Sequence, residues 1–322
     1  MFMKAIVYHQ YGDPGVLKMM EVDKPVPREG EVLIRVKAAC INDWDWALMK
    51  GDAVNRMING FKKPKINILG SDIAGVVESS GIKAGKFKKG DEVYGDLSGR
   101  WGGFAEYVCA PEKSLALKPK SMSFTEAAAL PQAGMLAVQG LIDCGKIKKG
   151  EKVLINGAGG GVGTIGIQLA KTFDAEITGV DNAYKQDQMI ALGFDQALDY
   201  TKDDFTRKGT KYDLVFDVKT SRSVLDYARA LEPGGRYVTA GGSISRLLQA
   251  LICMPLFYLF SKKRIRIVNL KVNKDLGYLN ELYEEGKLKP VIDVPYAFDD
   301  YKIAFERYGS MNFFGKVVLA LE

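Results

Sequence analysis

The chain has 322 residues, of which 47% are hydrophobic and 26% are charged, a balance typical of a globular protein with an apolar core. This length exceeds that of one comfortable hydrophobic core and therefore predicts two domains. The net charge of +6 comes from basic residues spread along the chain, without a basic block interleaved with aromatic residues, so we expect no nucleic-acid partner.

The first part of the chain, to about residue 122, is predicted to be rich in β-strands with little helix. Apolar or alternating segments indicate strands at 3–8, 31–40, 68–78, 89–94 and 104–109. The stretch 22–31 between the first two is rich in turn residues. A helix is expected to begin near Ser123, because a serine followed by Glu126 three residues later forms a capping box.

After this helix the pattern changes to alternating strands and helices, which predicts an α/β fold with a doubly wound parallel sheet over 123–272. The expected strands are 152–156, 175–180, 196–199, 212–217 and 235–240, and the expected helices lie near 162–173, 184–192 and 222–230. The tail adds helices near 274–286 and 298–308 and a strand at 315–321. We expect the tail to return to the first domain, which then comprises 1–122 and 273–322.

The stretch 153–171, VLINGAGGGVGTIGIQLAK, combines an apolar strand, a glycine cluster and a helix. Glycines allow a sharp turn and bring main-chain N–H groups close to a diphosphate, and the N-terminus of a helix also favours an anion. A second strand follows and closes on Asp181, about twenty residues further on. The pattern therefore predicts a binding site for a dinucleotide cofactor.

One strongly apolar segment, 247–260 (LLQALICMPLFYLF), is followed by a basic run that begins at Lys262. The segment is too short to cross a bilayer, and Pro255 interrupts it. We expect a buried helix, a pocket wall or a subunit contact. The alternative is a patch that lies on an anionic membrane surface.

Four cysteines, Cys40, Cys109, Cys144 and Cys253, lie far apart and none belongs to a CxxC pair. That spacing argues against a disulfide framework and against a thiolate zinc site, and it fits a reducing compartment. The first residues enter a strand-like pattern and show no signal-peptide pattern. We therefore predict a cytoplasmic protein with no transmembrane segment.

The chain resembles, nearly from end to end, the zinc-free quinone oxidoreductase-like branch of the medium-chain dehydrogenase/reductase superfamily. The motifs that carry the resemblance are MKAIVY, GDPGVLKMMEV, GEVLIRVKAACIND, LGSDIAGVVE, FKKGDEVYG, GGFAEYV, FTEAAALP, LINGAGGGVG, LEPGGRYV and FGKVVL. The resemblance implies a Rossmann dinucleotide-binding domain and a β-rich GroES-like catalytic domain. It also implies a homodimer, in which 265–272 either pairs with a second copy or is an internal edge strand.

Zinc ligands are missing where the zinc-dependent members of this family have them. The position of the catalytic cysteine matches Asn42, and the position of the histidine matches Ser71. The whole chain contains one histidine, His9, so we expect neither a His/Cys zinc site nor histidine-based acid–base catalysis. We therefore predict no metal.

Without a metal, hydrogen bonds must stabilise the charge that develops on a carbonyl oxygen, which suits the reduction of a quinone, an α,β-unsaturated carbonyl or an aldehyde. Asn42 is either a polar pocket residue or a turn residue before Asp43. Trp44 and Trp46 either form an apolar wall for a flat substrate or pack in the core. We predict a zinc-independent NAD(P)H-dependent oxidoreductase, with Asn42 and Trp46 at its catalytic site.

Two positions depart from the family's pattern beside the nicotinamide. Ala47 stands where many members have a tyrosine or a lysine, and Leu136 stands at a threonine position. No proton donor is therefore evident in the sequence, and water is left as the source of the proton. The alternative function is a redox sensor or structural protein that binds NAD(P)H with little turnover.

The coenzyme preference rests on residues that follow the second strand of the parallel sheet. Asp181 favours NADH because its carboxylate repels a 2′-phosphate, whereas Lys185 and Tyr200 lie where NADPH-using members of the family bind that phosphate. Lys185 is otherwise a solvated residue at a helix start. On the resemblance we favour NADPH. The predicted cofactor contacts are Ala158, Gly160, Gly161, Val162, Gly163, Asp181, Lys185, Tyr200, Gly241, Gly242, Phe314, Gly315 and Lys316.

Overall fold

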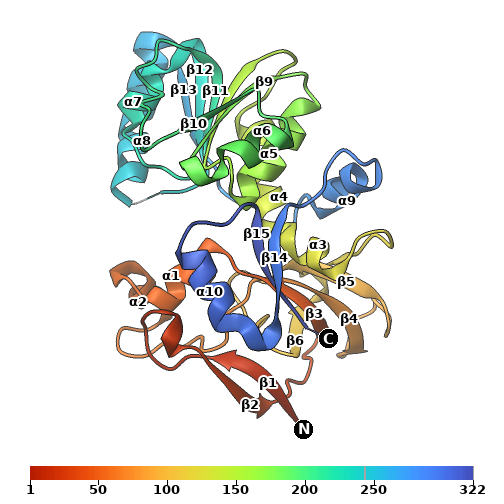
Figure 1. The fold of residues 1–322 in the computed structure, drawn as a ribbon. Coiled ribbons are helices and arrows are strands. Elements are labelled where there is room, and N and C mark those ends of the chain that lie inside the picture. Colours follow the sequence, from red (N-terminus) through yellow and green to blue (C-terminus); the bar gives the residue numbers. More distant parts are fainter. Residues whose placement is uncertain (243, 322) are drawn as a thin grey trace. The chain divides into compact units, whose positions relative to one another are not determined.

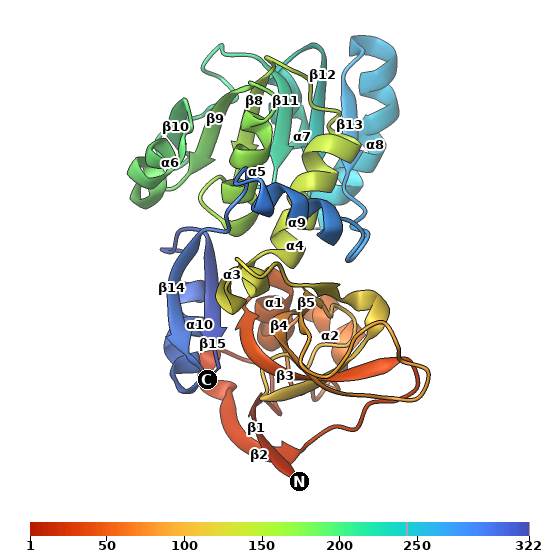
Figure 2. The ribbon, with the colours of Figure 1, turned by 90° about the vertical axis from the view of Figure 1, so that its right-hand side faces the viewer.

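The structure is a computed structural model that describes residues 1–242 and 244–321, and the side chains of all of these except Ile244, Leu256 and Phe260. Within this part of the chain there are two compact units, each with its own sheet (Figures 1 and 2). Unit 1 comprises Met1–Gln132, Val272–Glu284 and Ile292–Glu322, and unit 2 comprises Ala133–Lys271 and Glu285–Val291. The division therefore falls at Gln132, whereas the sequence predicted it at 122. Residues 285–291 lie in unit 2, whereas the sequence predicted them in the first domain.

Unit 1 is built on a mixed sheet that has seven strands among the described residues, in the order β14-β15-β3-β4-β5-β7 with β6 paired to β3. These strands are β3 (Glu31–Cys40), β4 (Asp72–Ser80), β5 (Glu92–Asp96), β6 (Tyr107–Pro111), β7 (Ala116–Leu117), β14 (Ile292–Ala297) and β15 (Lys316–Ala320). A separate antiparallel pair is formed by β1 (Phe2–Val7) and β2 (Lys18–Asp23). Because β15 pairs with β3, the end of the chain completes the sheet that its beginning starts.

Strand β3 is buried along nearly all of its length, because strands pair with it on both edges and helices of unit 1 pack against it. Val32, Ile34 and Val36 belong to one apolar core together with Phe104 and Phe305. The helices of this unit include α3 (Phe124–Ala129), α9 (Leu276–Glu284) and α10 (Tyr301–Gly309). Helix α3 begins at the capping box that the sequence predicted, with the Glu126 N–H donating to Ser123 Oγ over 3.2 Å.

Two helices that the sequence did not predict follow β3, so the expectation of little helix in this region is wrong. Helix α1 spans Asp43–Lys50 and α2 spans Ala53–Asn59. Gly51 ends α1 with a φ of 64°, a left-handed conformation that glycine adopts without strain. Asp52 then caps α2 by accepting the Asn55 N–H over 2.8 Å.

Unit 2 contains a fully parallel sheet, with six strands in the described part of the chain, in the order β10-β9-β8-β11-β12-β13. The strands are β8 (Lys152–Asn156), β9 (Glu176–Asp181), β10 (Gln196–Asp199), β11 (Tyr212–Asp217), β12 (Leu231–Thr239) and β13 (Arg264–Ile267). The helices are α5 (Gly161–Lys171), α6 (Gln186–Leu192), α7 (Val224–Arg229) and α8 (Ile244–Ser261), while α4 (Pro131–Val138) crosses the division between the units. The predicted Rossmann-type sheet is confirmed.

Two predicted segments lie at the edge of this sheet. Strand β13 covers the first part of 265–272, pairs in parallel with β12 and is the last strand of this sheet. Pairing of its other edge with a second copy, and with it the predicted homodimer, stays a prediction. Helix α8 covers the apolar segment 247–260. Of the helices in 1–242 and 244–321, none combines the length and the apolar character needed to cross a membrane.

Candidate functional site

The loop between β8 and α5 has the geometry of a dinucleotide-binding turn. Gly157 follows the strand with a φ of 86°, and the N–H groups of Gly157 and Ala158 both donate to the carbonyl of Val180, over 2.9 and 3.1 Å. Helix α5 then begins after Gly160, so its first N–H groups have no partner within the helix and suit an anion. The sequence analysis missed Gly157, although a glycine placed directly after a buried strand is the signal that marks it.

Gly163 is the position where α5 approaches this loop most closely. A Cβ atom at Gly163 would lie 2.4 Å from the carbonyl oxygens of Gly157 and Ala158, a distance that real side chains do not reach. At Gly160 the nearest atom would be 3.5 Å away, so a side chain there meets no clash. The close approach therefore depends on Gly163. The structure brings together the predicted loop residues Ala158, Gly160, Gly161, Val162 and Gly163.

Asp181 and Lys185 form a buried pair beside the loop. Asp181 Oδ2 accepts the Gly159 N–H over 2.9 Å, and Oδ1 lies 3.3 Å from Lys185 Nζ. The Lys185 side chain is 4% exposed, so the alternative of a solvated lysine is wrong. It also covers Gly159, where a Cβ atom would lie 2.4 Å from Lys185 Cδ. Tyr200 joins them because its N–H donates to the Asp181 carbonyl over 3.1 Å, while its side chain stays exposed.

Gly241 and Gly242 follow β12 at the same carboxyl edge of the sheet, where the loop after β11 meets them. The Gly241 carbonyl accepts from Thr220 Oγ1 over 2.8 Å and from Thr239 Oγ1 over 2.5 Å. At Gly242 a Cβ atom would lie 2.9 Å from Thr220 Cβ, so this loop also needs a residue without a side chain. The carboxyl edge of a parallel sheet is where this class of fold binds its ligand.

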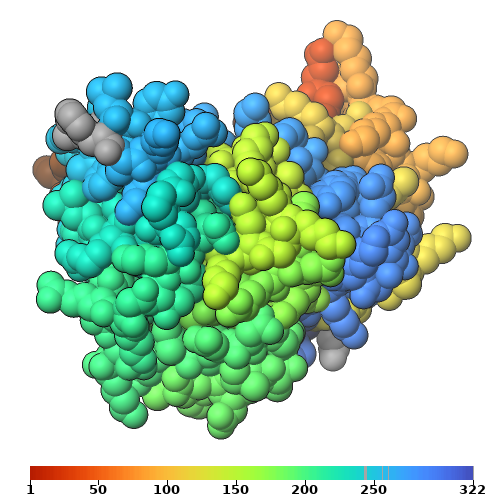
Figure 3. Space-filling model, turned by 90° about the horizontal axis from the view of Figure 1, so that it is seen from above, coloured from red at the N-terminus to blue at the C-terminus, as the bar shows by residue number. Residues whose placement is uncertain are grey.

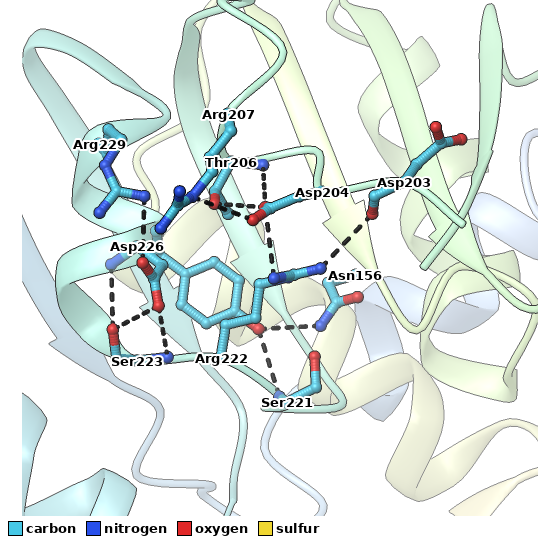
Figure 4. Close-up of polar contacts among 11 residues, drawn as sticks. Asn156, Asp203, Asp204, Thr206, Arg207, Ser221, Arg222, Ser223, Asp226 and Arg229 are labelled. Carbon is cyan, nitrogen blue, oxygen red and sulfur yellow. Dashed lines mark hydrogen bonds and ion pairs between the residues drawn. The ribbon is translucent and has the colours of Figure 1, made fainter. Parts of the chain in front are cut away.

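Polar contacts hold the loops that follow β10 and β11 (Figure 4). Arg222 lies 3.3 Å from Asp204, and the Asp204 carboxylate also accepts from the hydroxyl of Thr206 over 2.6 Å. These bonds, led by the one from Thr206, hold the pKa of Asp204 below its usual range. Nearby, Ser223 and Asp226 form the capping box that begins α7. Side chains of unit 2 therefore hold these two loops together.

Unit 1 contains a second cluster, built where β15 pairs with β3. Val318 pairs with Cys40, so the register sets Lys316 opposite Asn42. Lys316 Nζ donates to Asn42 Oδ1, and Asn42 Nδ2 donates to Ser71 Oγ over 3.0 Å. All three side chains are buried. Asn42 therefore precedes α1, as a turn residue would, and is also part of a polar cluster, while its catalytic role stays a prediction.

Two buried carboxyl groups, Asp72 and Asp96, complete this cluster. They pair across β4 and β5, which places both side chains on one face of the sheet. Burial raises the pKa of both carboxyl groups, and Lys316 opposes the rise. Among the described residues, Asp72 Oδ1 and Asp96 Oδ2 have no hydrogen-bond partner. Burial lowers the pKa of Lys316, but Cys40 and Asp72 outweigh it and raise the pKa overall, so the lysine stays charged.

These side chains do not fit a zinc site. Asn42 and Ser71, which match the positions of a cysteine and a histidine in zinc-dependent members of the family, offer an amide and a hydroxyl. The ammonium of Lys316, bound to Asn42, repels a metal cation. Throughout the described ranges, no group of three or more His, Cys, Asp or Glu residues is placed to hold a metal ion.

The two tryptophans of α1 have different surroundings. The Trp46 ring lies 5.9 Å from the Tyr308 ring, and a Cβ atom at Gly309 would lie 2.2 Å from Trp46 Cη2. Trp46 is thus packed against α10, which is the core-packing alternative, and its place at the catalytic site stays a prediction. Trp44 is 47% exposed.

The remaining predicted contacts belong to unit 1. Phe314 and Gly315 precede β15, and the Phe314 N–H donates to Asp293 Oδ1 over 3.3 Å. Lys316 follows and is bound to Asn42 as described above. The predicted contact of these three residues with the cofactor is not tested by their surroundings and stays a prediction.

Two family profiles and many known proteins are similar to this chain. The profile "Alcohol dehydrogenase GroES-like domain" matches residues 28–120, and "Zinc-binding dehydrogenase" matches residues 192–319. The 2-methylene-furan-3-one reductase of Solanum lycopersicum is 37% identical over 98% of this chain and 79% of its own length. The NADPH-dependent alkenal/one oxidoreductase of Arabidopsis thaliana, a chloroplastic protein, is 34% identical over 98% of this chain and 79% of its own length. Among solved structures, the quinone oxidoreductase of Coxiella burnetii has a TM-score of 0.87 and 28% identity, and the similarity covers 100% of both chains.

Proposed function

Because this chain belongs to the medium-chain dehydrogenase/reductase superfamily, in its quinone oxidoreductase-like branch, and is an NAD(P)-dependent oxidoreductase, we propose that it reduces quinones or α,β-unsaturated carbonyl compounds without zinc. The names of its relatives support this substrate class, since they include an enone reductase, an alkenal/one oxidoreductase and quinone oxidoreductases. Aldehydes are the remaining carbonyl class to test.

The observation that carries the proposal is the chain of hydrogen bonds from Lys316 through Asn42 to Ser71. The ammonium fixes Asn42 Oδ1 as an acceptor, so the amide group presents its N–H side away from Lys316. Amide N–H and serine O–H groups held in a buried, preorganised cluster are the donors that stabilise a developing oxyanion. They occupy the two positions where zinc-dependent relatives would carry metal ligands.

The reaction then needs a hydride and a proton. A bound nicotinamide supplies the hydride. In an enone the hydride adds to the β-carbon, the π electrons of the C=C bond move toward the carbonyl oxygen, and the resulting enolate takes a proton from water to give the saturated ketone. In a quinone the same addition of a hydride and a proton gives the hydroquinone. We assign to Asn42 and Ser71 the donation of hydrogen bonds to the oxygen that becomes negative.

NADPH is the coenzyme that we propose, on the arrangement around Asp181. Its carboxylate already accepts the Gly159 N–H and pairs with Lys185, so its repulsion of a 2′-phosphate is partly neutralised. The ammonium of Lys185, which pairs with Asp181, is the cation that we assign to such a phosphate. Tyr200 lies at the same edge with an exposed ring.

The test of the reaction is oxidation of NADPH and NADH by EDTA-treated protein with a quinone, an enone and an aldehyde. We expect turnover that survives EDTA, and for Asn42→Ala a loss of kcat of about a hundredfold, the effect of removing one oxyanion donor. The control is the Kd of NADPH, which the substitution should leave unchanged. An unchanged kcat in Asn42→Ala would remove the hydrogen-bond chain from the mechanism. NADPH binding without turnover of any acceptor would favour the redox sensor.

The test of coenzyme preference is Lys185→Gln. We expect the KM of NADPH to rise about tenfold, as for the loss of one charge-assisted bond, with little change for NADH. The matched control is Lys171→Gln on α5, a lysine paired with Asp195 rather than with Asp181. An equal rise for both coenzymes would show that Lys185 supports the loop and does not select the phosphate.

A homodimer and a cytoplasmic location belong to the proposal as well. Strand β13 is the edge of its sheet and offers a row of backbone groups to a second copy. The cytoplasmic location rests on the cysteine spacing, although several of the similar plant proteins are named as chloroplastic. Gel filtration of the purified chain tests the first, and microscopy of the tagged chain in its own cell tests the second.

A further inference from the structure

The strand order of unit 2 reverses between β8 and β11. From β8 the chain continues through β9 and β10 toward one edge of the sheet, and from β11 it continues through β12 and β13 toward the other. In an open parallel sheet a ligand binds outside the carboxyl ends of the strands, at the point of such a reversal. The loops that follow β8 and β11 therefore border the place where the coenzyme binds.

The loop after β11 is held to the end of β8 by Asn156, the last residue of that strand. Asn156 Nδ2 donates to Asp217 Oδ1 over 2.8 Å and to the carbonyl of Lys219 over 2.8 Å. The Val218 N–H donates to the Asn156 carbonyl over 2.9 Å. The next residue along, Thr220, is bound to the loop after β12. The backbone at Lys219 is thus fixed on both sides.

The side chain of Lys219 lies over the dinucleotide turn. A Cβ atom at Gly157 would lie 3.0 Å from Lys219 Cγ and 3.3 Å from Lys219 Cβ, so the stem of this lysine packs against the first glycine of the turn. Lys219 is nevertheless exposed as a whole residue. A lysine of this kind covers a surface with its methylene groups and keeps its ammonium in water. The side chain beyond Cγ is long enough for that ammonium to reach a ligand bound on the turn.

Exposure alone would not distinguish Lys219 from other lysines of unit 2. Most of this unit, yellow-green to light blue in Figure 3, presents a broad surface. Lys149, Lys152 and Lys208 are exposed as well. Lys152 begins β8, so it lies at the end of the strand that is opposite to the turn. The feature that singles out Lys219 is its contact with Gly157.

We propose that Lys219 is a further coenzyme-binding residue, whose ammonium binds the diphosphate that NADH and NADPH share. The diphosphate belongs at this turn because backbone N–H groups and the N-terminus of α5 suit an anion there. A lysine ammonium adds a positive charge and N–H donors for the phosphate oxygens. The inference rests on the binding of NADH or NADPH by this chain and not on which acceptor the chain reduces.

The 2′-phosphate of NADPH is the other anionic group to consider. In this class of fold the ribose that carries it binds at the end of the second strand, whereas the diphosphate binds at the first turn between a strand and a helix. Asp181 ends β9 and pairs with Lys185, whose stem covers Gly159. Gly157, by contrast, directly follows β8. The position of Lys219 over Gly157 therefore favours the diphosphate.

The experiment is to measure the Kd of NADH and of NADPH by coenzyme fluorescence, with the full chain and with Lys219→Met. Methionine keeps an unbranched stem over Gly157 and removes the charge. We expect both Kd values to rise about tenfold, as for the loss of one charge-assisted bond, and we expect added salt to reduce this difference from the parent chain. Lys219→Arg keeps the charge and should bind both coenzymes like the parent. The matched control is Lys152→Met, which should leave both Kd values unchanged.

Three results would overturn the proposal. The first is a pair of unchanged Kd values in Lys219→Met. The second is an equal rise in Lys219→Arg, because the shape of the stem and not the charge would then matter. The third is a rise confined to NADPH, which would assign Lys219 to the 2′-phosphate. Since these are binding measurements, a chain that binds both coenzymes and reduces no acceptor would contradict the proposed function without affecting the test of Lys219.

Discussion

The close approach of α5 to the dinucleotide turn can be tested by adding one methyl group. In Gly163→Ala the new Cβ would lie 2.4 Å from two carbonyl oxygens, whereas ordinary contacts begin at 3.4 Å. The helix or the loop must therefore move by about 1 Å, a strain that in packed interiors costs about 1–3 kcal/mol. Alanine also favours the helix by about 1 kcal/mol, which opposes part of this loss.

Gly166→Ala supplies the matched control, since it makes the same change one turn further along α5. There the nearest atom to the new Cβ is Ile155 Cδ1 at 3.4 Å, an ordinary contact, so the helix preference should act without strain. Because that preference is common to both variants, the difference between their free energies of unfolding isolates the clash at Gly163. We expect Gly166→Ala to be the more stable by about 1–3 kcal/mol.

The assay is urea unfolding of both variants, together with titration of each with NADPH. A displaced loop also displaces the N-terminus of α5, so we expect Gly163→Ala to bind NADPH more weakly and Gly166→Ala to bind it like the parent chain. Equal stability of the two variants, together with an equal Kd for NADPH, would refute the reasoning and would mean that Gly163 does not set the approach of helix and loop.

Three further predictions concern unit 1. Burial raises the pKa of Asp45 to about 7, so the folded chain keeps a proton that the unfolded chain releases near 3.8, and the free energy of unfolding should fall as the pH rises from about 4 to about 7. Urea unfolding at several pH values measures this slope, which Asp45→Asn should flatten. Lys316→Met removes the cation that opposes the raised pKa of Asp72. We expect the free energy of unfolding to fall by about 3–5 kcal/mol at neutral pH and by less in acid, where the carboxyl group is protonated. An equal loss at neutral and at acid pH would contradict this. Ser123→Ala removes the cap of α3 and should lower the free energy of unfolding by about 1 kcal/mol, measured as a lower Tm.

The parts of the fold that could be predicted from the sequence are those whose signals are local. The strand, glycine turn and helix around Gly163 depend on neighbouring residues, and the same holds for the capping box at Ser123. Helices α1 and α2 were missed because each is short and lies between strands, and their start signals at Asn42 and Asp52 are single polar residues that also occur in turns. Strand β14 was missed because Pro295 interrupts its pattern.

The cluster in unit 1 could be predicted only in part. Comparison of motifs pointed to Asn42 and Ser71 as the residues that replace metal ligands, because each lies in a recognisable local sequence. The bond from Lys316 to Asn42 joins residues 274 positions apart, and it follows from the register of β15 against β3, which no local pattern encodes. For Lys185, local sequence left open a solvated lysine at a helix start or a lysine that pairs with the 2′-phosphate and with Asp181. Packing over Gly159 and the pair with Asp181 rule out the solvated side chain, and the contact with the phosphate stays a prediction.

The return of the tail to the first sheet has a consequence for the order in which the protein matures. Strand β15 pairs with residues 38–40 of β3 and is made after every strand of the parallel sheet of unit 2. The parallel sheet can therefore form during synthesis, whereas the end of β3 that β15 covers waits for its partner. The same delay applies to charge, since Asp72 and Asp96 gain the ammonium of Lys316 only after β15 has been made. A chain that stops short of Lys316 would leave this end of β3 unpaired and the two carboxyl groups without that cation.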